Sequence, residues 1–198
     1  MRPVKNAQVG ENRLQIWDEK EQQPDMYGGE MDSQSLFTFI LEMAGTIAFA
    51  ASGAMVGAQR GMDIFGICVL GVVTAVGGGA TRDIILGIVP PGMFQNPIYT
   101  IVATVTSCIV FAIMYWKQEL LEGENRLVYD KIMLVMDSVG LGVFTVMGVD
   151  KGITEGYMGR TFFLVFLGTV TGVGGGLIRD MMAGVPPYIF VRHIYACA

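Results

Sequence analysis

The sequence predicts an all-α fold: a polytopic transmembrane bundle in which two three-helix units form an inverted repeat. Three observations lead to this prediction. Hydrophobic residues make up 52% of the 198 residues, charged residues only 16%, and the mean hydropathy is +0.50, a balance outside the usual range of soluble domains. Several apolar runs reach the roughly 20 residues that a helix needs to cross the hydrocarbon core. One motif also occurs twice, at a constant offset (174 − 77 = 97 and 180 − 83 = 97).

The repeated motif covers residues 74–83 in its first copy and 171–180 in its second. Each copy has a glycine triplet, then two other residues, then an arginine and an aspartate. The triplets are Gly77, Gly78 and Gly79, and Gly174, Gly175 and Gly176. Each glycine weakens a helix by about 1 kcal/mol relative to alanine, and a charge at mid-bilayer costs roughly 2.5–3.5 kcal/mol. Because both unfavourable features occur together in each of the two copies, we expect these segments to do more than anchor the chain in the membrane.

Five complete spans and the start of a sixth are expected along the chain. They cover residues 36–58, 64–89, 98–116, 132–149 and 161–184, and a sixth begins near Tyr188, within which the chain ends at Ala198. The first is rich in small residues, which let helices approach closely in lipid. The second and fifth contain the motif and stop at paired prolines, which cannot continue a helix.

These spans divide the chain into four parts. They are a polar disordered tail (1–35), a first three-helix unit (36–117), a charged linker (118–131) and a second, truncated three-helix unit (132–198). Because three spans per unit is an odd number, the second unit must enter the membrane from the opposite side. We expect the second and fifth helices to be broken at their glycine triplets. Inverted repeats place a permeation site near the midplane, where such broken helices meet.

Five charged residues are the candidate site residues: Arg82, Asp83, Asp137, Arg179 and Asp180. Adjacent residues on a helix point about 100° apart, so we do not expect an arginine to pair with the aspartate that follows it. Reciprocal pairing across the repeat, Arg82 with Asp180 and Arg179 with Asp83, is the hypothesis. Asp137 and backbone carbonyls are alternative partners for the arginines. The charges either line a polar path or only lock the two halves together.

The cysteines and the single histidine indicate no further chemistry. Cys68, Cys108 and Cys197 have no CxxC spacing and lie in apolar surroundings, where thiols act mostly as small hydrophobes. His193 has no second metal-ligand candidate nearby. We therefore expect no disulfide, metal, cofactor or catalytic residue, and no nucleic acid as partner.

Several stretches together resemble a known family, the prokaryotic trimeric intracellular cation (TRIC) channels and their bacterial relatives, also called the glycine-transporter family. They are residues 48–54, 60–66 and 136–141, both glycine–arginine–aspartate motifs, and Pro186-Pro187 followed by Arg192 and 194–196. The resemblance implies a multi-pass protein of the bacterial plasma (inner) membrane with seven spans, assembled as a homotrimer. It also implies one pore per protomer, lined by kinked second and fifth helices. On this chain the kinks fall at the two triplets, and the charged pore positions are the motif arginines and aspartates.

Three functional hypotheses remain open. The first is a passive pathway for monovalent cations, K⁺ or Na⁺, gated at the glycine kinks, where a movable arginine can serve as a barrier. The second is a secondary transporter of a small amino acid such as glycine, bound by half-helix amides, an arginine and an aspartate. The third is a non-transporting membrane scaffold. An enzyme is not expected, because the sequence has no nucleophile–base set.

Overall fold

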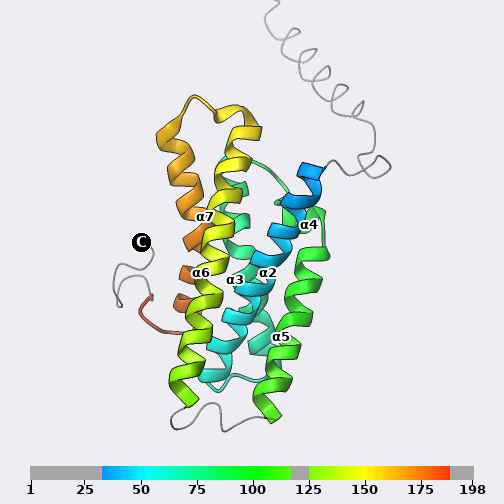
Figure 1. The fold of residues 1–198 in the computed structure, drawn as a ribbon, viewed down its shortest axis with the longest axis vertical. Helices are drawn as coiled ribbons and strands as arrows, with labels where there is room; N and C mark the ends of the chain where they lie inside the picture. The colour runs from blue at the N-terminus through cyan, green and yellow to red at the C-terminus, as the bar shows by residue number, and fades with distance from the viewer. Residues whose placement is uncertain (1–32, 117–124, 188–198) are drawn as a thin grey trace, which may run out of the picture. The chain divides into compact units, whose positions relative to one another are not determined.

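The structure is a computed structural model that describes residues 33–116 and 125–187, and within these ranges it is helical without strands (Figure 1). The elements are α2 (Ser33–Gln59), α3 (Ile64–Leu86), α4 (Gly92–Gln95), α5 (Ile98–Trp116), α6 (Asn125–Gly152), a π-helical segment η2 (Ile153–Tyr157) and α7 (Thr161–Met182). Among the described residues, five helices are long and apolar enough to cross a membrane. The predicted all-α, polytopic fold is therefore confirmed. Most of the polar tail and the expected sixth span lie outside the described residues.

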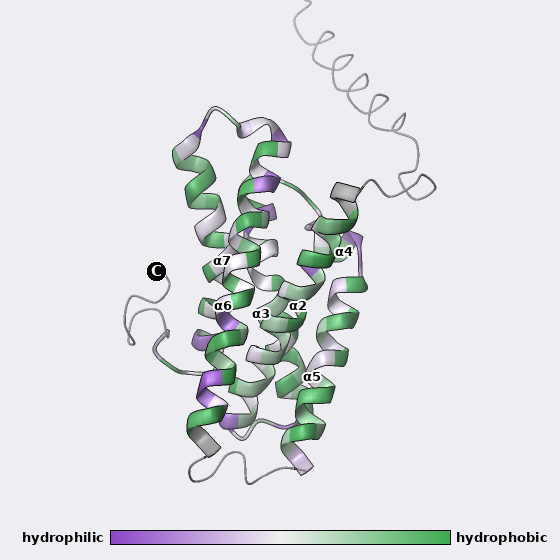
Figure 2. Ribbon diagram, in the orientation of Figure 1, coloured by the Kyte–Doolittle hydropathy of each residue, from purple (hydrophilic) through white to green (hydrophobic). Residues whose placement is uncertain are grey.

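The described residues from Phe37 onward belong to one compact unit, and the following description concerns that unit. Figure 2 shows hydrophobic residues along most of each long helix, with hydrophilic ones near the connections and at a few positions inside the bundle. On α5, Ile101, Val105 and Ile109 are all exposed at a spacing of four residues. This stripe forms the apolar outer face that a helix presents to lipid.

Both motif-bearing helices end in the same way. The amide of Ile88 donates to the carbonyl of Asp83, and the amide of Val185 donates to the carbonyl of Asp180. Gly87 and Gly184 adopt positive φ angles of 74° and 64°, which glycine accepts at a helix C-terminus without a Cβ penalty. This geometry ends α3 at Leu86 and α7 at Met182, slightly earlier than the expected spans.

The fourth span is longer than expected. α6 begins at Asn125 rather than near Ile132, so the second part of the predicted charged linker is helical. Tyr129 explains this extension, because its ring is 4% exposed and its hydroxyl donates to the carbonyl oxygen of Met55 at 2.6 Å. The contact of Tyr129 with α2 thus stabilises the first turns of α6, in a stretch whose charged residues alone predicted a non-helical linker.

The glycine triplets mark the crossing of α3 and α7. A Cβ added to Gly78 would lie 2.2 Å from the carbonyl oxygen of Thr171, and one added to Gly175 would lie 2.2 Å from that of Thr74. Because position 78 meets 171 while 74 meets 175, the two helices cross in antiparallel directions. Small residues at such a crossing let two backbones approach in lipid.

The predicted break of the second and fifth helices is wrong for this structure. α3 and α7 are α-helical through both triplets, and the described glycines with positive φ, Gly61, Gly87, Gly156 and Gly184, all lie outside these two helices. The physical reason is that the glycines provide space for the neighbouring backbone. Contact at this distance needs the loss of a Cβ, and it does not need unwinding.

α2 and α6 form a second antiparallel pair. The rings of Phe49 and Phe144 stack with centroids 5.3 Å apart, and a Cβ on Gly140 would lie 2.3 Å from the Phe49 ring. In Figure 1, α2 descends from blue to cyan while α6 ascends from green to yellow. Equivalent positions on these two helices differ by a constant offset (144 − 49 = 95 and 140 − 45 = 95).

Candidate functional site: two unequal arginine clusters

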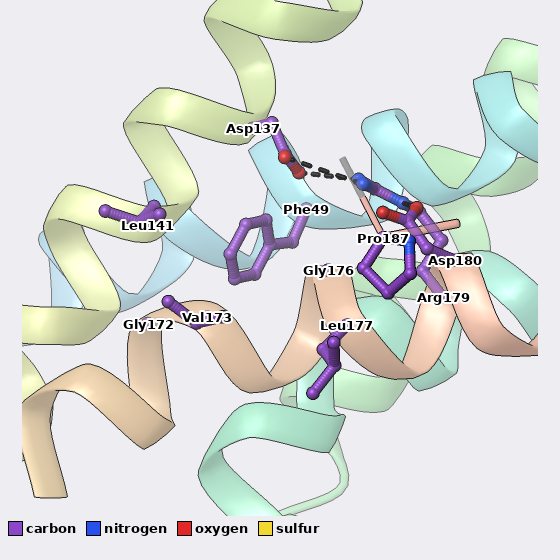
Figure 3. Close-up of a pocket in the computed structure, with 10 residues that line it drawn as sticks. All are labelled: Phe49, Asp137, Leu141, Gly172, Val173, Gly176, Leu177, Arg179, Asp180 and Pro187. Atoms are coloured by element: carbon purple, nitrogen blue, oxygen red, sulfur yellow. Dashed lines mark hydrogen bonds and ion pairs between the residues drawn. The ribbon is translucent and has the colours of Figure 1, made fainter. Parts of the chain in front are cut away.

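Arg179, near the end of α7, is the centre of a buried polar cluster (Figure 3). Its Nε donates to Asp180 Oδ1 at 2.8 Å. Its Nη1 donates to Asp137 Oδ1 on α6 at 2.5 Å and to the hydroxyl of Ser52 on α2. Ser52 in turn donates to Asp137 Oδ1 at 3.2 Å. Three helices therefore hold one guanidinium, whose side chain is only 2% exposed.

A buried ion pair of this kind is not by itself evidence of stability. Desolvation of each ion costs several kcal/mol, and removing one partner commonly costs 3–5 kcal/mol because it leaves an uncompensated charge. Within the described ranges, no buried side-chain nitrogen or oxygen lacks a hydrogen-bond partner. The cluster is thus fully satisfied, which fixes the position of α7 relative to α2 and α6.

A small pocket lies beside the cluster. Its lining residues are Phe49, Asp137, Leu141, Gly172, Val173, Gly176, Leu177, Arg179, Asp180 and Pro187. The volume open to the centre of a water molecule is about 10 Å³, close to the minimum that holds one water. In Figure 3 the Arg179 side chain is turned toward Asp137, and Phe49, Leu141 and Val173 lie on the side of the pocket away from Asp180. The pocket is therefore polar at one end and apolar at the other.

Arg82, the equivalent residue of α3, has a simpler environment. Its Nε and Nη2 both contact Asp83 Oδ1, at 2.9 and 2.8 Å. Asp83 also accepts a hydrogen bond from the backbone amide of Gly92 through Oδ2, at 2.8 Å, which ties the end of α3 to the start of α4. In the part of the chain that the structure describes, Asp83 is the only partner of Arg82, whose side chain is 13% exposed.

The predicted pairing is therefore wrong in one respect and right in another. Each arginine does pair with the aspartate that follows it, and the reciprocal pairs between the two motifs do not form. The arginine side chain is long enough to turn back along its own helix. The guanidinium then lies over the glycine three residues earlier, and a Cβ on Gly176 would be in ordinary contact with Arg179 Nη2 at 3.6 Å. The alternative partner for Arg179, Asp137, is confirmed.

Sequence reasoning missed the roles of Ser52, Glu42 and Tyr99. Ser52 is fully buried inside the cluster. The Tyr99 hydroxyl on α5 donates to the Glu42 carboxylate on α2. A signal for Glu42 was present, because it corresponds to Asp137 under the offset that relates α2 and α6 (137 − 42 = 95).

Comparison of the chain with known proteins identifies its family. The family model described as Glycine transporter matches residues 39–115 and 134–198. The chain belongs to this family. One relative of this glycine-transporter family member is a UPF0126 membrane protein of Deinococcus radiodurans, which is 38% identical over 160 residues (80% of this chain, 69% of the relative). Another is the UPF0126 inner membrane protein YadS of Escherichia coli K12, which is 39% identical over 164 residues (82% of this chain, 74% of the relative).

Solved structures agree with this assignment. A TRIC trimeric intracellular cation channel orthologue from Rhodobacter sphaeroides is 30% identical with a TM-score of 0.71, covering 81% of this chain and 77% of that one. A prokaryotic TRIC channel in 0.5 M KCl is 31% identical with a TM-score of 0.73, covering 82% and 78%. The resemblance to TRIC channels and the multi-pass location in the bacterial plasma membrane are confirmed. The family model is described as a glycine transporter, and the solved relatives are described as cation channels.

Proposed function

We propose that this protein is a channel for monovalent cations, K⁺ or Na⁺, and that its pathway passes along the α3–α7 crossing beside the two arginine clusters. The observation that carries the proposal is the Arg179–Asp137–Ser52–Asp180 cluster, buried at the crossing of spanning helices. Ionisable groups inside a membrane commonly mark ion pathways. The structural relatives are named as cation channels, which supports the same conclusion.

The described conformation corresponds to a closed state in this proposal. The pocket beside Arg179 has room for about one water molecule, and a K⁺ ion needs a continuous polar path. Opening requires α3 and α7 to separate or to tilt at their triplets. The closest contacts at the triplets suit this movement, because Gly78 and Gly175 each meet a backbone carbonyl of the other helix. The two triplets, Gly77, Gly78 and Gly79 and Gly174, Gly175 and Gly176, are then the segments at which the gate moves.

We also propose that two inverted-repeat units assemble the pathway and that the functional protein is a homotrimer. The constant offsets, 97 between α3 and α7 and 95 between α2 and α6, together with their antiparallel contacts, support the repeat. The trimeric relatives support the oligomer. Size-exclusion chromatography with light scattering on the purified protein tests it, because a monomer in mild detergent would contradict the trimer.

A second candidate function, a transporter of glycine, is favoured by the description of the family model. Arg82 would bind the substrate carboxylate and Asp83 its ammonium group, both at the end of α3. A third, a membrane scaffold, would leave every charge in a structural role. Both alternatives make predictions that differ from those of a channel.

Reconstitution of the full chain into liposomes separates the three. We expect a K⁺ diffusion potential to collapse without any added amino acid. Saturable, gradient-driven uptake of [¹⁴C]glycine without ionic conductance would instead identify the transporter. Neither signal, in a protein shown by circular dichroism to be folded, would leave the scaffold.

A further inference from the structure

The two arginine clusters occupy equivalent positions but are held differently. Arg179 contacts Asp180, Asp137 and Ser52, whereas Arg82 contacts Asp83 alone among the described residues. The side chain of Arg179 is 2% exposed and that of Arg82 is 13% exposed. One guanidinium is fixed by three helices, and the other is attached only to its own helix.

The offset between α2 and α6 identifies what Arg82 lacks. Asp137, the inter-helix partner of Arg179, corresponds to Glu42 (137 − 42 = 95), and Ser52 corresponds to Met147 (147 − 52 = 95). A methionine cannot replace the hydroxyl that bonds Arg179, so one support of Arg82 is missing from the sequence. The carboxylate is present, with one more methylene than aspartate, but it is engaged elsewhere.

Glu42 is engaged by Tyr99. The tyrosine hydroxyl donates to the Glu42 carboxylate, from the first turn of α5. A hydroxyl can hold a carboxylate in a partly buried site, but it does not neutralise the charge. A guanidinium does both, and it makes stronger, charge-assisted hydrogen bonds. Glu42 is therefore a carboxylate for which the Tyr99 hydroxyl and the arginine that the repeat offsets assign to it, Arg82, can compete.

We propose that Arg82 is the mobile gating residue and that it exchanges between two carboxylates, Asp83 in the closed state and Glu42 in the open state. Tyr99 holds Glu42 away from Arg82 in the closed state. When Arg82 moves to Glu42, it pairs with a carboxylate of the preceding helix, as Arg179 does with Asp137, but it gives up the bond to its own neighbouring aspartate that Arg179 keeps with Asp180. Asp83 Oδ1 then loses its guanidinium partner and faces the pathway as an acceptor for a cation. Arg179 stays fixed throughout.

The gating role of Arg82 rests on the proposed channel function. The exchange of Arg82 between Asp83 and Glu42 does not depend on that function. The chemistry needs no outside reactant, because one hydroxyl–carboxylate hydrogen bond and one ion pair are replaced by another ion pair. Asp83 keeps its hydrogen bond from the amide of Gly92, so the end of α3 stays tied to α4 in both states.

The test uses the full chain with Tyr99→Phe, which removes the competing hydroxyl and leaves the ring. A hydrogen bond to a charged group shifts a two-state equilibrium by about tenfold or more. We expect the Tyr99→Phe variant to conduct K⁺ in liposomes several-fold faster than the wild type. The double variant Tyr99→Phe/Glu42→Gln should return to the wild-type rate or below, because the amide cannot neutralise Arg82. The matched control is Tyr115→Phe, on the same helix, whose exposed ring lies far along α5; it should not change the rate.

A crystal or electron cryo-microscopy structure of the Tyr99→Phe variant gives a readout independent of transport. We expect the Arg82 guanidinium to lie on Glu42. If it stays on Asp83, the exchange is overturned. If the guanidinium moves to Glu42 but the Tyr99→Phe variant conducts K⁺ at the same rate as a conducting wild type, the gating role is overturned. If the wild type itself conducts no K⁺, the channel proposal fails, and the position of Arg82 still decides the exchange.

Discussion

Gly78 of α3 lies against the carbonyl oxygen of Thr171 on α7, and this contact leaves no space for a side chain. The equivalent glycine, Gly175, makes the same contact with Thr74. The two threonines are fully buried, and each hydroxyl donates back to the carbonyl four residues earlier, at 2.6 Å. Two glycines and two threonines thus define the closest contact between the helices that carry the arginines.

Substitution of either contact glycine should destabilise the protein. Gly78→Ala and Gly175→Ala each place a Cβ 2.2 Å from a backbone carbonyl oxygen, so α3 and α7 must separate. We expect a loss of about 1–3 kcal/mol, as for overpacked cores, measured by thermal unfolding in detergent.

Gly142→Ala is the control for these variants. A Cβ at this α6 position would have nothing within 4 Å, and alanine is the better helix former. Equal melting temperatures for Gly78→Ala and Gly142→Ala would contradict the close crossing.

Loss of the Asp137 carboxylate should be costly. Asp137→Asn keeps the shape of the side chain but leaves the buried Arg179 with Asp180 as its only charged partner in the described residues. Breaking a buried ion pair costs about 3–5 kcal/mol, and we expect the lower end because Asp180 remains. The measurement is the same unfolding assay.

The adjacent Ser138→Ala is a matched control for Asp137→Asn. The Ser138 hydroxyl is exposed and donates to the Leu134 carbonyl of its own helix, so the expected change is within about 0.5 kcal/mol. An Asp137→Asn variant as stable as Ser138→Ala would show that the cluster does not hold α6 to α7.

The contact of α3 with α5 can be tested with the native thiols. Cys68 Sγ and Cys108 Sγ lie 3.5 Å apart, close enough for side-chain rotation to bring them to bonding distance. In a Cys197→Ala background, we expect copper–phenanthroline to oxidise them to an intrachain disulfide, detected by mass spectrometry of the digested protein. Recovery of only alkylated, reduced thiols would mean that α3 and α5 are not neighbours at this level. Cys68→Ala is the negative control.

Much of the fold could be predicted from the sequence, because apolar length and proline stops act locally. The third span, Ile98–Trp116, agrees with the structure at both ends. The start of α6 was misjudged because Tyr129 is stabilised by a distant carbonyl on α2. The continuity of α3 was misjudged because glycine is compatible with both unwinding and close packing, and only the neighbouring helix decides between them.

The sequence predicted which charged residues belong to the candidate site better than it predicted which of them contact one another. The repeated motif identified both arginines, and charge inside an apolar run identified Asp137. Which aspartate an arginine pairs with depends on the length of its side chain and on the acceptors that neighbouring helices place near it. The spacing of residues in the sequence gives neither. Ser52 looked like one small residue among many in the first span, so its contact with Arg179 had no signal in the residue type.

The unequal arginines should respond differently to removal. Arg179→Ala leaves two buried carboxylates, Asp137 and Asp180, without their guanidinium, so we expect loss of folded protein in size-exclusion chromatography. Arg82→Ala leaves only Asp83, which keeps the Gly92 amide, so we expect folded protein in near-normal yield. Similar yields of both variants would contradict the difference in how they are held.

The most direct test of the central claim, that cations pass beside the arginine clusters, is the unitary K⁺ conductance of Arg82→Ala in planar bilayers. Removing a positive charge from the pathway should change the conductance, because local charge sets the concentration of cations at a pore. We predict an altered conductance from an assembly of unchanged size. A conductance identical to that of the wild type would contradict the account.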